Sequence, residues 1–119
     1  MSGRNSNTGM SKMVRRESLG SYEVSCTRMD RLAKGFTAPD VIKMDVEGAE
    51  SEVLKGALRI FESVRPLLIC EVHDAINEEF VTSWLEGKRY RMQWLDSSPR
   101  FPRQLFGWPV ERHESEFQI

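Results

Sequence analysis

Two short segments of this 119-residue sequence combine a strand-like apolar pattern with residues that could perform acid–base chemistry. In the segment 41–48, VIKMDVEG, Asp45 and Glu47 interrupt apolar residues at alternate positions, so their side chains share one face of a strand. In the segment 67–73, LLICEVH, Glu71 and His73 have the same spacing at the end of an apolar run. Three carboxylates and an imidazole held close together shift one another's pKa values, and such shifts create acid and base roles.

Each of these residues also has a structural explanation that involves no chemistry. Glu47 could interact only with a helix N-terminus, and Asp45 could pair with Lys43 on the same strand face. His73 could be an exposed residue that follows a strand. Glu71 is harder to explain, because an unpaired carboxylate within an apolar strand is costly. A divalent metal held by Asp45, Glu47, Glu71 and His73 is chemically possible, but nothing in the spacing requires one, so no metal site is predicted.

The pattern between the two segments predicts a strand–helix–strand unit. Apolar residues recur at helical spacing from Ala49 to Val64, and Pro66 ends the helix. Such a unit makes the flanking strands, 41–46 and 67–72, parallel neighbours. The second strand is so apolar that we expect it to be covered on both faces.

The carboxyl ends of parallel strands are where open α/β sheets bind their ligands. If the two strands are adjacent, the four chemical residues lie at one rim of the sheet. This rim is the predicted active site.

The remaining chain is expected to complete one domain over residues 1–119. Residues 1–20 are polar, without an apolar period, and are predicted to be a flexible entry segment. Residues 21–95 are predicted to form the α/β core, with a helix from Ala75 to Glu86 and a strand from Tyr90. Residues 96–119 are predicted to be either an irregular C-terminal arm or an antiparallel hairpin.

Composition excludes several classes of protein. Lysine and arginine (17) nearly balance aspartate and glutamate (18), which argues against a surface built for nucleic acid or an anionic membrane. No apolar run approaches the roughly 20 residues of a membrane span. The two cysteines, Cys26 and Cys70, have no metal-binding spacing and indicate a reducing, cytoplasmic compartment.

The segment 38–73 resembles the signature of the FkbM family of S-adenosylmethionine-dependent methyltransferases. The residues that match its pattern are Ile42, Lys43, Asp45, Glu47, Gly48, Glu50, Val53, Leu54, Gly56, Arg65, Pro66 and Glu71. Upstream, Thr27, Asp30 and Leu32 also resemble the family's sequence.

The resemblance implies a partial Rossmann-like fold, a class I methyltransferase three-layer sandwich with parallel core strands and crossover helices. The implied reaction is methyl transfer from S-adenosylmethionine to an oxygen of a small molecule or glycan. Asp45 and His73 are then the candidate bases, and Glu47 and Glu71 would orient the acceptor or a neighbouring base.

Class I methyltransferases of this kind hold the cofactor with a glycine-rich loop and an acidic residue that precede the matched segment. The eight glycines of this chain lie singly, so no cofactor-binding residues are assigned. The chain resembles the C-terminal half of such a domain. We therefore expect a homo-oligomer, or a missing N-terminal half, to cover the exposed sheet. The alternative function is an inactive methyltransferase-like domain that acts as a binding or assembly module.

Overall fold

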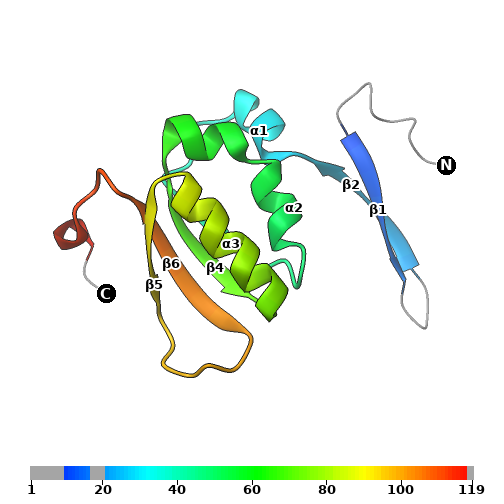
Figure 1. The fold of residues 1–119 in the computed structure, drawn as a ribbon. Coiled ribbons are helices and arrows are strands. Elements are labelled where there is room, and N and C mark those ends of the chain that lie inside the picture. The colour runs from blue at the N-terminus through cyan, green and yellow to red at the C-terminus, as the bar shows by residue number, and fades with distance from the viewer. Residues whose placement is uncertain (1–9, 17–20, 118–119) are drawn as a thin grey trace.

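The computed structural model describes residues 10–16 and 21–117, which form two separate sheets (Figure 1). Strands β1 (Met10–Arg16) and β2 (Ser21–Thr27) pair as an antiparallel hairpin. The sequence predicts a flexible entry segment over residues 1–20, but Met10–Arg16 is instead a paired strand. Strand pairing uses backbone hydrogen bonds, so it can form in a segment without a regular pattern of apolar residues. Residues 1–9 and 17–20 lie outside the described residues.

The main sheet has four strands in the order β3-β4-β6-β5. They are β3 (Val41–Met44), β4 (Leu67–Val72), β5 (Tyr90–Trp94) and β6 (Arg103–Pro109). Strands β3 and β4 are parallel and in register from Val41 opposite Leu67 to Met44 opposite Cys70, which confirms the predicted pair. Strand β6 runs antiparallel between β4 and β5, so the segment 96–119, predicted to be an irregular arm or an antiparallel hairpin, contributes one strand to the main sheet.

The helix expected from Ala49 to Val64 is divided into two pieces. Helix α2 (Glu50–Lys55) ends at Gly56, and the second piece has π-helical hydrogen bonding over Ile60–Val64. At the division, a Cβ atom on Gly56 would lie 3.2 Å from Cγ of Arg28. The close approach of these two segments of the chain favours glycine at position 56.

Asp30, in the short helix α1 (Met29–Leu32), stabilises this division. Its N–H donates to the carbonyl of Gly56 at 2.9 Å. Its carboxylate accepts from the N–H groups of Arg59 (2.8 Å) and Ile60 (3.0 Å), so it caps the second helical piece from a distant part of the chain.

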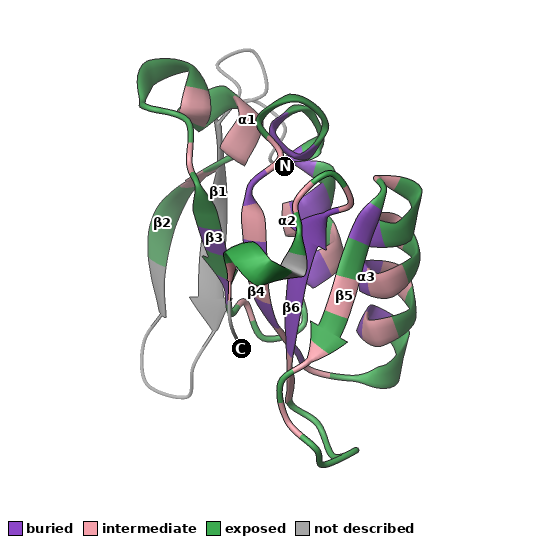
Figure 2. Cartoon of the chain, turned by 90° about the vertical axis from the view of Figure 1, so that its left-hand side faces the viewer, coloured by how far each residue is buried: buried purple, intermediate pink, exposed green. Residues whose placement is uncertain are grey.

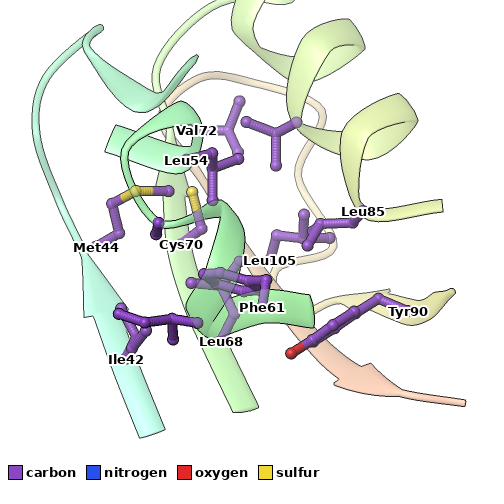
Figure 3. Close-up of a cluster of buried hydrophobic side chains, with 13 residues drawn as sticks. Ile42, Met44, Leu54, Phe61, Leu68, Cys70, Val72, Leu85, Tyr90 and Leu105 are labelled. Atoms are coloured by element: carbon purple, nitrogen blue, oxygen red, sulfur yellow. The ribbon is translucent and has the colours of Figure 1, made fainter. Parts of the chain in front are cut away.

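The hydrophobic core lies between the helices and one face of the main sheet (Figure 3). Along β4 the buried residues Leu68, Cys70 and Val72 alternate with partly exposed ones, so the expected cover on both faces of this strand is wrong for the described residues. Helix α3 (Ala75–Gly87) contributes Val81 and Leu85 from the side that faces the sheet (Figure 2).

The α/β class is confirmed by this four-stranded sheet and its helices. On the sheet face opposite the core, Phe117 of the C-terminal arm contacts Phe106 and Trp108. A second helical layer is not seen among the described residues, so the three-layer sandwich stays a prediction. None of the helices in these residues is long and apolar enough to cross a membrane.

Arg65 links the end of the divided helix to the C-terminal arm. Its backbone is left-handed (φ 63°), and its guanidinium donates to the carbonyls of Phe61 (3.0 Å), Lys88 (2.6 Å) and Arg89 (3.1 Å). It also bonds both carboxylate oxygens of Glu111, which lowers the pKa of Glu111 to about 2. Arg65 therefore joins the divided helix, the segment before β5 and the C-terminal arm.

Candidate active site

Three of the four predicted site residues meet at the carboxyl ends of β3 and β4. One ligand-type atom from each of Asp45, Glu71 and His73 lies within 4.8 Å of the other two. The parallel register explains this, because Met44 is opposite Cys70 and the next residues along the two strands are Asp45 and Glu71. The catalytic role of these residues stays a prediction.

Glu47 does not join this group. It lies in the turn between β3 and α2, where it is exposed and has a left-handed backbone (φ 48°). Gly48 follows with φ 101°, a conformation that glycine adopts at little cost. The turn directs the chain into α2 and leaves the Glu47 side chain outside the cluster.

Asp45 pairs with His73 rather than with Lys43. Its Oδ1 atom lies 3.5 Å from Nε2 of His73, and no ion pair joins it to Lys43 in the part of the chain that the structure describes. Lys43 is exposed on the open face of β3. The structural explanation of Asp45 as a partner of Lys43 is therefore wrong.

Glu50 is the residue that sequence reasoning missed. It is fully buried at the start of α2, and its Oε2 atom lies 2.6 Å from Nδ1 of His73. The same oxygen accepts from the N–H of Gly48 at 3.4 Å, while Oε1 has no hydrogen-bond partner among the described residues. The available signal was a carboxylate in the first turn of a helix that begins directly behind the rim.

Helix α3 holds the turn in place from the other side. Asn77 is buried, and its side-chain amide donates to the carbonyl of Gly48 at 3.2 Å. Asp74 caps α3 by accepting from the N–H of Asn77 at 2.8 Å. The turn that positions Glu50 is therefore fixed to the helix that follows His73.

These contacts determine how His73 can act. The hydrogen bond that Glu50 accepts from the ring is the largest cause that raises the pKa of His73. Burial opposes the rise, and the nearby charges of Glu50, Glu71 and Asp45 add to it. In the neutral ring, Nδ1–H donates to Glu50 and leaves the lone pair of Nε2 on the side of Asp45. The His73 side chain is 21% exposed, so solvent and ligands can reach the imidazole.

We expect the pKa of His73 to lie above the ordinary histidine value of about 6.5. A raised pKa means that the folded protein is stabilised by protonation of His73. This contribution to the free energy of unfolding is complete below the pKa of the unfolded chain and is lost as pH rises through the pKa of the folded protein. NMR titration of the imidazole C–H signals measures the value. Glu50→Gln removes the largest cause and should return the pKa toward 6.5, whereas a wild-type value at or below 6.5 contradicts the expectation.

Comparison with known proteins identifies the family. Residues 2–92 match the Methyltransferase FkbM domain. Over 68 residues the chain is 37% identical to the hexuronic acid methyltransferase AglP of Haloferax volcanii. The aligned region covers 56% of this chain and 28% of AglP. The fold is similar to the crystal structure of Methyltransferase FkbM from Methylobacillus flagellatus KT, with a TM-score of 0.61 and 26% identity over 80% of this chain and 25% of that one.

The chain thus spans about a quarter of the length of these two relatives. The matched family domain includes both strands of the rim, the turn between β3 and α2, and His73. The chain belongs to the FkbM methyltransferase family.

Proposed function

We propose that this chain provides the acceptor side of an S-adenosylmethionine-dependent O-methyltransferase that acts on a small molecule or glycan. One observation carries the proposal: buried Glu50 holds the imidazole of His73 at a rim that it shares with Asp45 and Glu71. Family membership supports the reaction class. The likeness to a protein named as a hexuronic acid methyltransferase supports an acidic sugar as acceptor.

The rim residues suit the removal of a proton from an acceptor hydroxyl. The oxygen that attacks a methyl group must lose its proton to a base within hydrogen-bond reach. Neutral His73 would take this proton at Nε2, and the buried carboxylate of Glu50 would stabilise the resulting imidazolium. Asp45 is the second candidate base.

The other two predicted residues are assigned to orientation of the acceptor. Glu71 adjoins His73 at the rim and can accept hydrogen bonds from further hydroxyls of a sugar. Glu47 would contact the acceptor from the exposed turn before α2.

S-adenosylmethionine would supply an electrophilic methyl group, but the described residues do not by themselves fit this cofactor. Gly56 is packed against Arg28, and Gly107 against Leu85 and the backbone of Arg91. Gly48, with open space around it at the rim, is a single glycine rather than a phosphate- or nucleotide-type loop. The cofactor site is therefore not assigned to residues of this chain.

We expect the isolated chain to bind S-adenosylmethionine weakly or not at all, because it has no glycine-rich loop. Isothermal titration calorimetry tests this, with the Methylobacillus flagellatus relative as a comparison under the same conditions. Micromolar binding to the isolated chain would contradict the expectation.

The proposed reaction is tested with S-adenosylmethionine labelled at its methyl group. The matched segment of AglP is replaced by the corresponding segment of this chain, and the chimera is offered acceptors that contain a hexuronic acid. The proposal expects a labelled methyl ether at a hydroxyl of the acceptor. A folded chimera that binds the cofactor but transfers no methyl group would contradict it.

A second candidate function is a binding or assembly module, favoured by the isolated glycines. In the described sheet β3 is an edge strand, and Val41 is 52% exposed on its open face. We propose that a second copy, or the rest of a longer protein, pairs with this edge strand and covers Val41. Near-neutral charge supports a function without nucleic acid or membrane, and the free thiols of Cys26 and Cys70 support a cytoplasmic location.

A further inference from the structure

A pocket of about 370 Å³ lies between β5, β6 and the C-terminal arm. The residues that line it are Arg91, Trp108, Val110, Arg112, His113 and Ser115. Arg91 is opposite Trp108 in the pairing of β5 with β6, and both lie on the sheet face away from the core residue Tyr90. None of these six described lining residues carries a carboxylate, so their polar side chains offer mainly hydrogen-bond donors.

Trp108 gives an independent indication of a ligand. It is only 3% exposed, and its Nε1–H group is buried without a hydrogen-bond partner among the described residues. Phe106 stacks on the ring at 5.3 Å, and Phe117 meets it edge-on at 5.6 Å, so the indole is held in this position. Buried donors are normally satisfied, and a molecule in the pocket would provide the missing acceptor.

The charges around the pocket favour an anion. Arg91 is exposed on β5, and Arg112 is half-buried on the arm. The Nε of Arg112 donates to Glu116, whose carboxylate also accepts from the backbone N–H of His113 at 3.4 Å. Among these described side chains, one carboxylate stands against two guanidinium groups, so their summed charge is positive.

We infer that this pocket binds a small anion of monosaccharide size through a carboxylate or phosphate group. Arg91 and Arg112 would contact the anionic oxygens, since guanidinium groups match both carboxylate and phosphate. The volume is at the lower end of the range for small-molecule sites and is larger than a single phosphate needs.

This site is distinct from the rim. Gln104 is opposite Glu71, and Trp108 lies four residues further along β6, which is about 13 Å at the rise of a strand. The inference therefore does not depend on methyl transfer at His73.

The test uses the ¹⁵N-labelled chain at low ionic strength and follows the three tryptophan indole N–H signals by NMR. The probes are D-glucuronate, D-glucose 6-phosphate and neutral D-glucose, so the two anions distinguish a carboxylate ligand from a phosphate ligand. We expect the Trp108 signal to shift with at least one anion and not with glucose. Arg91→Gln should weaken this binding by about tenfold, the loss expected for a charged hydrogen bond. Arg100→Gln, in the loop between β5 and β6, should leave it unchanged.

Several results would overturn the inference. They are a Trp108 signal that shifts with neither anion at about 10 mM, an equal response to glucose, or equal weakening by Arg100→Gln and Arg91→Gln. If Arg91→Gln does not give a native spectrum, Arg112→Gln takes its place with the same expected loss.

Discussion

His73→Gln is expected to lower methyl transfer by about 10²- to 10⁴-fold, the range for loss of a general base. The variant removes the nitrogen that faces Asp45 but keeps an amide that can donate to Glu50. This matters because removal of one partner from a buried charged pair is strongly destabilising. The measurement is methyl transfer to a hexuronic acid acceptor by the chimera that carries this segment.

Glu52→Gln is the control, because Glu52 lies within the matched domain, is exposed on α2 and does not belong to the cluster at the rim. It should leave methyl transfer unchanged. Asp45→Asn distinguishes the two candidate bases: if His73 is the base, Asp45→Asn should have the smaller effect. A His73→Gln chimera that is folded and fully active would contradict the assignment of His73.

Phe61→Ala is expected to lower the free energy of unfolding by about 3–5 kcal/mol. Phe61 is 1% exposed and packs against Trp84 (centroids 5.3 Å apart, planes at 80°) and Tyr90 (5.5 Å, 50°). Its loss would leave a cavity between the divided helix, α3 and β5. Urea denaturation followed by circular dichroism measures the change.

Leu58→Ala provides the comparison, because Leu58 lies in the same helical region but is 38% exposed. Its truncation should cost about 1 kcal/mol or less, since little apolar surface is buried there. Equal losses for the two variants would show that the core is not centred on Phe61.

The sheet and helices could be predicted where a local pattern and the tertiary structure agree. The parallel pair of β3 and β4 follows from two apolar segments joined by a helical one, and α3 follows from the period of Val81 and Leu85. The division of the helix at Gly56 could not be predicted in this way, because the apolar period continues through it. The division depends on Asp30, which is distant in sequence and provides hydrogen bonds from another element.

The same distinction applies to the site. Asp45, Glu71 and His73 could be placed together because strand alternation and a parallel register fix their positions. Glu50 could not, because its contact with His73 depends on the left-handed turn at Glu47 and Gly48 and on its complete burial. A carboxylate at the start of a helix is normally explained by the helix dipole alone.

The pH dependence of methyl transfer, in the wild type and in Glu50→Gln, tests most directly whether His73 is the base that Glu50 holds. In kcat/KM this dependence reports the pKa of the base in the free enzyme. The rate of the wild-type chimera should rise as pH passes the raised pKa of His73, because only the neutral ring accepts a proton. Glu50→Gln should move this rise to lower pH and lower the maximum rate. A rise at the same pH in both proteins would contradict the account.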